Sequence, residues 1–211
     1  MRTHLLWLLC ALLILSLVTC TSKSTDPTIP DDGMYPDAVG SRFVFVNTQD
    51  SDSTRPPDTS VIEITAKWTD STGALIVHFE YPDILGKGGY TARIYGDTVD
   101  IKQDNNPTDQ PNFRILFPLE VGRQWTVPGP DLVVSVDSCD QVETPAGTFR
   151  KAYLLHYEIN AIGGSMVIEL WIAPGVGMVR EDHWTSMVVY PPAEETHSVT
   201  ELVTYSIPND D

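Results

Sequence analysis

Residues 142–179 read VETPAGTFRKAYLLHYEINAIGGSMVIELWIAPGVGMV. Residues 144–147 (TPAG) suit a type I turn, with Pro145 at the second position and a glycine free to take positive φ. Residues 173–176 (APGV) suit a type II turn, because Gly175 supplies the positive φ that its third position needs. The stretch therefore predicts three successive antiparallel strands, with residues 161–164 as a hairpin loop.

Apolar and polar side chains alternate between these turns, as in half-buried strands. In residues 149–159, Lys151 interrupts one apolar face, which comprises Phe149, Tyr153, Leu155, Tyr157 and Ile159. In residues 165–172, Ser165, Val167, Glu169 and Trp171 lie opposite a second apolar face, which comprises Met166, Ile168, Leu170 and Ile172.

The same reasoning predicts strands along the rest of the chain. They are residues 41–47, 61–69, 75–81, 90–101 (one strand, or two that meet at 96–97), 114–117, 132–136, 177–190 and 196–207. Two of the expected apolar faces are Ile62, Ile64, Ala66 and Trp68, and Val199, Val203, Tyr205 and Ile207. Residues 119–125 are either a short helical turn or an irregular edge. We expect an all-β fold: a strongly curved antiparallel sheet, half-barrel or barrel meander, of about ten strands.

The composition limits the function. The chain has 211 residues and a formal net charge of −16, which argues against nucleic acid as a partner. Cys10 and Cys20 lie at the N-terminus, so Cys139 is left alone in the β domain and cannot form an internal disulfide there. We expect no cofactor and no metal.

The N-terminus has the pattern of an export signal. Arg2 precedes the apolar residues 5–18, a run too short to span a bilayer but typical of a secretory signal peptide. Residues 17–20 (LVTC) resemble the lipobox of bacterial lipoproteins, although Thr19 stands where that family has Gly, Ala or Ser. The resemblance implies cleavage before Cys20 and lipidation of Cys20. Ser22, in place of an inner-membrane aspartate signal, implies an outer-membrane location.

We therefore divide the chain into three parts. Residues 1–19 are a signal peptide, residues 20–33 are the lipidated cysteine and a flexible polar tether, and residues 34–211 are a single antiparallel β domain.

Three kinds of side-chain cluster could carry chemistry. Asp104, Asn105, Asn106 and Asp109 could attract calcium, but they lack EF-hand spacing and also suit a turn. Three pairs share a strand face and could support acid–base work: His156 with Glu158, His78 with Glu80, and Glu181 with His183. No nucleophile motif accompanies them. Trp68, Trp125, Trp171 and Trp184 could face an apolar ligand or fill the core.

The segments VETPAGTF and WIAPGVGMV resemble the C-terminal part of uncharacterised bacterial envelope lipoproteins, including TapB-like proteins. The matching residues are Pro145, Ala146, Gly147, Phe149, Trp171, Ala173, Pro174, Gly175, Val176 and Gly177. The architecture is similar to Lol-type lipoprotein carriers, whose half-barrel encloses an apolar cavity. The resemblance implies a fold and suggests ligand binding, but it transfers no catalytic or binding residue.

Three functional hypotheses follow. The first is a non-catalytic, membrane-tethered envelope lipoprotein that binds an apolar small molecule or a partner envelope protein. The second is a structural module that contacts other proteins through an exposed sheet edge. The third is a hydrolase in which His156, His183 and nearby carboxylates converge in one cleft.

Overall fold

The computed structural model describes residues 35–50, 56–81, 88–128, 132–161, 163–187 and 194–208. The predicted signal peptide (1–19), Cys20 and the tether (20–33) lie outside the described residues. Within the described ranges, no helix is long and apolar enough to cross a membrane.

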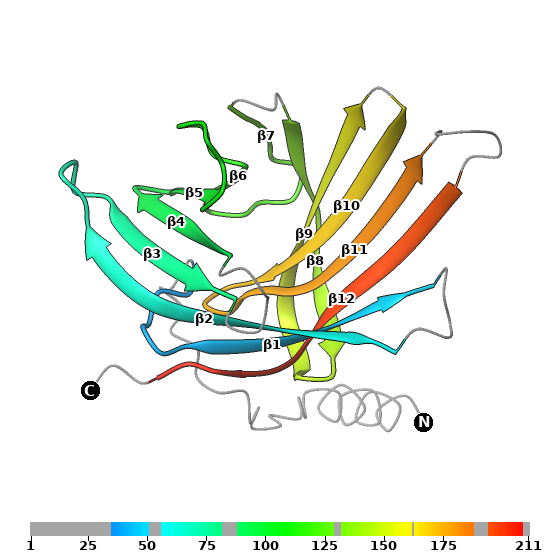
Figure 1. Ribbon diagram of the computed structural model, residues 1–211, viewed down its shortest axis with the longest axis horizontal. Helices are drawn as coiled ribbons and strands as arrows, with labels where there is room; N and C mark the ends of the chain where they lie inside the picture. The colour runs from blue at the N-terminus through cyan, green and yellow to red at the C-terminus, as the bar shows by residue number, and fades with distance from the viewer. Residues whose placement is uncertain are drawn as a thin grey trace, which may run out of the picture.

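The described residues form twelve strands in one sheet (Figure 1). The strands are β1 (Arg42–Gln49), β2 (Asp58–Thr69), β3 (Leu75–Glu80), β4 (Gly89–Tyr95), β5 (Thr98–Gln103), β6 (Phe113–Leu116), β7 (Gln124–Val127), β8 (Leu132–Thr144), β9 (Gly147–Ala161), β10 (Gly164–Ala173), β11 (Gly177–Met187) and β12 (Glu194–Ser206).

The strand order is β6-β5-β4-β3-β2-β1-β12-β11-β10-β9-β8-β7, and the paired strands are antiparallel. The first strand, β1, pairs with the last, β12, so the two edges are β6 and β7 in the middle of the sequence. The sheet curves until it is nearly closed into a barrel. The predicted all-β curved antiparallel sheet is confirmed, with twelve described strands instead of about ten.

The turns predicted in the central stretch are confirmed. Thr144 pairs with Gly147 where β8 turns into β9, and Ala161 pairs with Gly164 where β9 turns into β10. Between β10 and β11, Gly175 has a φ of 73°, and the Val176 N–H donates to the Ala173 carbonyl at 3.1 Å. Residues 90–101 form two strands with a turn at 96–97, the second of the predicted alternatives.

The expected alternation is wrong at several β-bulges, because an extra residue in one strand turns every following side chain to the other face. In β2, a register shift between Ile64 and Ala66 sends Trp68 to the outer face, where it is 48% exposed. In β12, the shift opposite Val44 and Phe45 places Leu202 in the core instead of Val203.

The face predicted for residues 149–159 is also corrected. Register shifts between β8 and β9 bring Ala152 into the core together with Phe149 and Leu155, although Ala152 was expected on the opposite face. By contrast, β8 follows the expected alternation at its start, because Leu132, Val134 and Val136 are buried.

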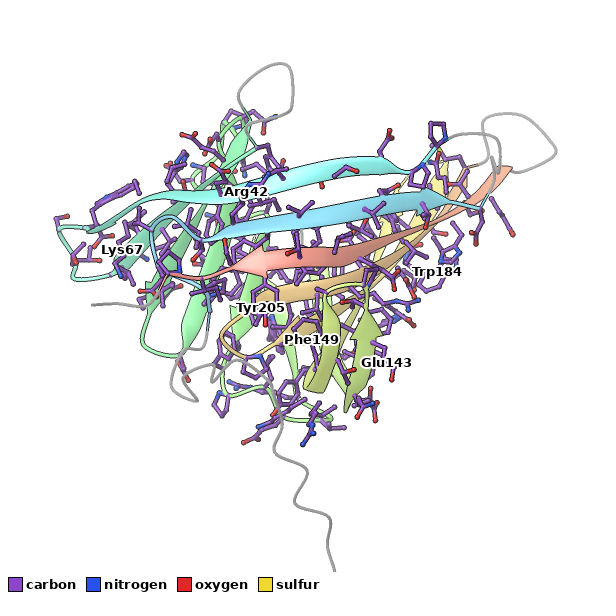
Figure 2. All side chains as sticks on the ribbon, turned by 90° about the horizontal axis from the view of Figure 1, so that it is seen from below. Arg42, Lys67, Glu143, Phe149, Trp184 and Tyr205 are labelled. Carbon is purple, nitrogen blue, oxygen red and sulfur yellow. The ribbon has the colours of Figure 1, made fainter. Side chains whose placement is uncertain are left out.

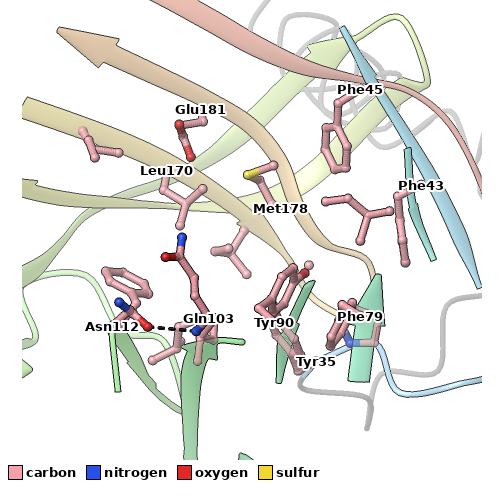
Figure 3. Close-up of a pocket in the computed structure, with 18 of the residues that line it drawn as sticks. Tyr35, Phe43, Phe45, Phe79, Tyr90, Gln103, Asn112, Leu170, Met178 and Glu181 are labelled. Carbon is pink, nitrogen blue, oxygen red and sulfur yellow. Dashed lines mark hydrogen bonds between the residues drawn. The ribbon is translucent and has the colours of Figure 1, made fainter. Parts of the chain in front are cut away.

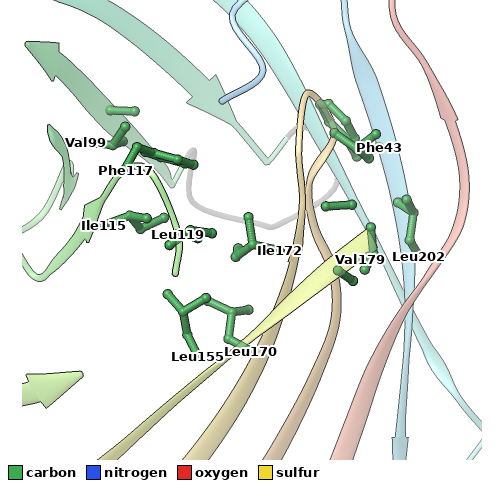
Figure 4. Close-up of a cluster of buried hydrophobic side chains, with 14 of the residues drawn as sticks. Phe43, Val99, Ile115, Phe117, Leu119, Leu155, Leu170, Ile172, Val179 and Leu202 are labelled. Atoms are coloured by element: carbon green, nitrogen blue, oxygen red, sulfur yellow. The ribbon is translucent and has the colours of Figure 1, made fainter. Parts of the chain in front are cut away.

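A seam joins the two edge strands. The Trp125 indole N–H in β7 donates to the Arg114 carbonyl in β6 at 2.8 Å. Residues 117–123 connect these strands without forming the helical turn that was one alternative for this region. Phe117 and Leu119 from this connection point into the core, toward Leu155 and Ile172 from the opposite wall (Figure 4). The connection therefore fills the interior beside the seam.

Exposed charged side chains form ion pairs at the surface of the sheet, and Figure 2 labels Arg42 and Lys67 among them. Arg42 pairs with Glu63 at 3.1 Å, and Lys67 reaches Asp37 at 3.2 Å. These side chains are between a third and a half exposed, so each pair contributes only ~0–1 kcal/mol to stability. The fold is therefore stabilised mainly by the apolar interior.

We expect Trp125→Phe to lower the free energy of unfolding by about 1–3 kcal/mol, because it leaves the Arg114 carbonyl at the seam without its donor. Chemical denaturation of the two proteins measures the difference. Trp68→Phe makes the same chemical change on the exposed outer face and is the control. Equal effects of the two substitutions would show that the seam bond contributes nothing.

Candidate functional site

The inner face of the sheet lines a half-open cavity of about 470 Å³ (Figure 3). Its wall draws residues from β1 to β6, from β8 to β11 and from the segment before β1. The aromatic lining residues are Tyr35, Phe43, Phe45, Phe79, Tyr81, Tyr90, Phe113 and Tyr157. The aliphatic lining residues include Ile168, Leu170 and Ile172 of β10 and Met178 of β11. Three of the four residues of the predicted apolar face of β10, all except Met166, are therefore confirmed as part of the interior.

The aromatic rings pack against one another. Phe79 stacks on Tyr90 with ring centroids 4.4 Å apart, and Tyr35 meets Phe79 edge-on at 5.9 Å. Burial raises the pKa of Tyr35 to about 12 and raises that of Tyr90 well above its usual value. Both phenols therefore stay neutral near pH 7, and this side of the cavity carries no charge.

A few polar groups interrupt the apolar lining: Glu181 of β11, Gln103 of β5, and Asn112 just before β6. Asn112 holds the loop between β5 and β6, because its Oδ1 accepts the Gln103 backbone N–H at 2.8 Å and Nδ2 of Asn106 at 3.0 Å. Figure 3 shows the Glu181 carboxylate and the Gln103 side chain directed into the cavity from opposite walls.

Glu181 is the charged group among the described residues of this lining. Burial, and secondarily the neighbouring charge of Asp182, raise the pKa of the Glu181 carboxyl. Within the described part of the chain, no hydrogen bond or ion pair holds it. Its negative charge in turn adds to the burial that raises the pKa of Tyr81 and of Tyr157. Glu181 is therefore a partly desolvated acceptor that faces apolar space.

The next residue shows the opposite arrangement. Asp182 lies on the outer face, where Arg180 Nη2 and Nε bind its carboxylate at 2.9 and 3.1 Å. Arg180 also contacts Glu201 at 3.4 Å and lies over the Trp171 ring at 5.3 Å from its centroid. Two successive carboxylates on β11 thus lie on opposite faces of the sheet, and among the described residues the outer one is paired and the inner one is not.

The structure separates the residues of the hydrolase hypothesis. His156 lies on the outer face, with Nδ1 3.9 Å from Glu169. His183 lies on the inner face beside Ile168, the same face as Glu181, as predicted. Burial lowers the pKa of His183. The hydrolase hypothesis requires His156 and His183 to converge in one cleft, and they do not, because the sheet lies between them.

His78 lies on the outer face near Glu80, as predicted, with 3.7 Å between its Nδ1 and Glu80 Oε1. It has two further partners that sequence reasoning missed. Thr65 Oγ1 is 3.1 Å from Nδ1, and Asp104 Oδ2 is 3.3 Å from Nε2.

The acidic loop of residues 104–109 takes the turn-forming role. Asn106 Oδ1 accepts the Thr108 backbone N–H at 2.9 Å, and Asp104 pairs with His78. In the residues that the structure describes, no group of three or more His, Cys, Asp or Glu side chains could hold a metal ion. Cys139 is a half-buried free thiol opposite Tyr153.

The four tryptophans do not line the cavity. Trp125 fills the core at the seam, while Trp171 lies outside beneath Arg180. Trp184 stacks on His197 at 4.7 Å on the outer face, and His197 Nδ1 is 2.7 Å from Asp50 Oδ2. The cavity is lined instead by phenylalanines and tyrosines, of which Phe43 and Phe45 occupy alternate, inward positions of β1 that the strand pattern could have revealed.

The comparisons with known proteins support the fold of the chain and nothing beyond it. No protein-family model matches the chain, and no curated protein does. Among solved structures, the chain is similar to a Bacteroides fragilis protein described as exported and as having a YmcC-like fold. The identity is 15%, the TM-score is 0.50, and the match covers 82% of this chain and 99% of that one. This likeness supports the architecture.

A second similar structure is a Parabacteroides distasonis protein described as a lipoprotein, with 14% identity and a TM-score of 0.49, over 82% of this chain and 98% of that one. Neither description mentions TapB-like proteins or Lol carriers, so that part of the sequence resemblance stays a prediction.

The unpaired carboxylate predicts that Glu181→Gln stabilises the free protein at pH 7. When folding raises the pKa of an acid, the folded state becomes less stable as the pH rises from the unfolded pKa through the folded pKa. A neutral amide removes this cost. We expect Tm at pH 7 to rise by about 2–4 °C, the shift that ~1 kcal/mol gives in a domain of this size. Thermal unfolding at pH 7 and at about pH 4 measures it.

Glu169→Gln, the same change on the outer face of β10, is the control and should leave Tm nearly unchanged. The gain for Glu181→Gln should shrink at the lower pH, where the carboxyl is mostly protonated in both states. A loss of stability for Glu181→Gln at pH 7 would contradict the argument.

Proposed function

We propose that this protein is a lipid-anchored component of the bacterial cell envelope, and that its barrel binds an apolar ligand without catalysing a reaction. The observation that carries the proposal is the cavity of about 470 Å³, walled by aromatic and aliphatic side chains. Ligand pockets in proteins typically have about 300–1,000 Å³ and a mostly apolar lining with a few polar groups.

The position of the cavity supports binding more than a role in packing alone. Core side chains such as Val134, Leu155 and Ile172 are fully buried, so the interior is tightly packed where it is filled. The side chains around an unfilled volume of this size lack dispersion contacts on one side, and a bound ligand would supply them. The alternative of a structural module that binds partners through a sheet edge is less favoured, because the edges β6 and β7 face each other across the Trp125 seam.

The anchor rests on the sequence. The resemblance of residues 17–20 to a lipobox supports acylation of Cys20, and the outer membrane is the location that Ser22 favours. Each buried CH₂ contributes about 0.8 kcal/mol, so several acyl chains would hold the protein firmly at a membrane. The polar residues 20–33 would then separate the barrel from the lipid surface.

Replacement of Cys20 tests the anchor. We expect Cys20→Ala to abolish labelling of the protein by radioactive palmitate in bacteria that produce the full-length chain. Cell fractionation should also show that Cys20→Ala is released from the membrane. Cys139→Ala is the control and should keep both the label and the membrane association. Palmitate labelling that persists in Cys20→Ala would remove the lipid anchor from the proposal.

Binding of a neutral apolar dye, N-phenyl-1-naphthylamine, tests the cavity. The protein is the unlipidated chain from residue 20 onward, with Cys20→Ser, and the dye should bind saturably. We expect one dye per chain, and we expect Met178→Trp to weaken binding about tenfold or more, because the larger side chain occupies the cavity. Met187→Trp makes the same change at an exposed position of β11 and should bind as the parent does. Non-saturable dye uptake, or equal binding by both variants, would refute ligand binding in the barrel.

A further inference from the structure

We propose that the ligand of this cavity is a cationic amphiphile: an apolar molecule whose head group is a protonated amine, held by the carboxylate of Glu181. This inference rests on the proposed function and specifies the ligand class. It depends on the one charged side chain among the described residues of the cavity lining and on the aromatic rings around it.

The charge of the site is negative. Glu181 projects into the cavity from β11, and the other polar lining residues, Gln103 and Asn112, are uncharged amides. The basic side chain next to Glu181 in sequence, Arg180, lies on the outer face and is occupied by Asp182 and Glu201. A ligand amine would therefore supply the positive partner that the carboxylate lacks among the described side chains of the lining.

The surrounding rings favour the same head group. Tyr81 and Tyr157 both line the cavity, and both are close enough to Glu181 to be affected by its charge. The faces of aromatic rings attract cations, and the attraction grows when the cation is desolvated. A carboxylate beside aromatic rings can thus bind an ammonium group by an ion pair and by cation–π contacts together.

The same features disfavour a fatty acid. A ligand carboxylate at this position would place a second negative charge beside Glu181, which is already partly desolvated, and like charges at short range disfavour binding. A neutral alcohol lies between these cases, because its hydroxyl group can donate one hydrogen bond to Glu181 but brings no charge. The order of affinity expected from the geometry is therefore amine, then alcohol, then acid.

Three probes that share one alkyl chain test this order: dodecylamine, dodecanol and dodecanoic acid, each used below the concentration at which it aggregates or separates from solution. The protein is the unlipidated chain from residue 20 onward, with Cys20→Ser, and the readout is displacement of N-phenyl-1-naphthylamine at pH 7, checked by native mass spectrometry for one ligand per chain. We expect dodecylamine to bind about tenfold or more tightly than dodecanoic acid.

Glu181→Gln and Glu169→Gln separate the specific ion pair from the general attraction of an amine to an acidic protein. Glu169→Gln removes the same charge from the outer face of β10. We expect Glu181→Gln to lose the preference for the amine and to keep its affinity for dodecanol within about twofold, while Glu169→Gln behaves as the parent does.

The possible outcomes distinguish the two proposals. If the acid binds as tightly as the amine, or if Glu181→Gln keeps the preference, the inference is wrong but the cavity still binds apolar ligands. If the dye binds and none of the three probes displaces it, the inference is also wrong. If neither the dye nor any probe binds, both the inference and the proposed function fail.

Discussion

The meeting of β6 and β7 is the constraint on which the rest of the structure depends. These strands are the two edges of the sheet, and the Trp125 indole of one donates to the Arg114 carbonyl of the other. Edge strands carry unpaired backbone groups, and curvature that brings two edges together protects both. The curvature of the sheet also makes one of its two faces the interior of the molecule. Phe117 and Leu119 of the connection fill part of that interior, and the remaining volume is the cavity.

The turns were predictable from the sequence and the bulges were not. Pro145, Gly147, Pro174 and Gly175 have backbone requirements that only a few turn geometries meet, so the hairpins could be located from residue type alone. A bulge has no such requirement here. At the end of β12, Leu202 and Val203 are both apolar, and only the pairing of β12 with β1 decides that Leu202 enters the core. Alternation was therefore reliable between bulges and wrong beyond them.

The site was partly predictable for the same reason. The alternation of β11 correctly placed Glu181 and His183 on one face, because no bulge separates them. It could not say that this face encloses an unfilled volume, which depends on side chains as distant in sequence as Tyr35 and Ile172. The tryptophans drew attention to the wrong face. Trp171 and Trp184 cover polar neighbours on the outside, where the ring faces Arg180 in one case and His197 in the other.

The two adjacent carboxylates of β11 show why the interior matters chemically. Asp182 is bound by a guanidinium group on the outer face, whereas Glu181, one residue earlier, faces a space walled by rings and aliphatic chains. Apolar walls bind by area and discriminate weakly between molecules of similar shape. A single desolvated charge discriminates strongly, because an unmatched charge in such a site is costly and a matched one is not. The aromatic wall would therefore set how tightly a ligand is held, and Glu181 would decide which head group is accepted.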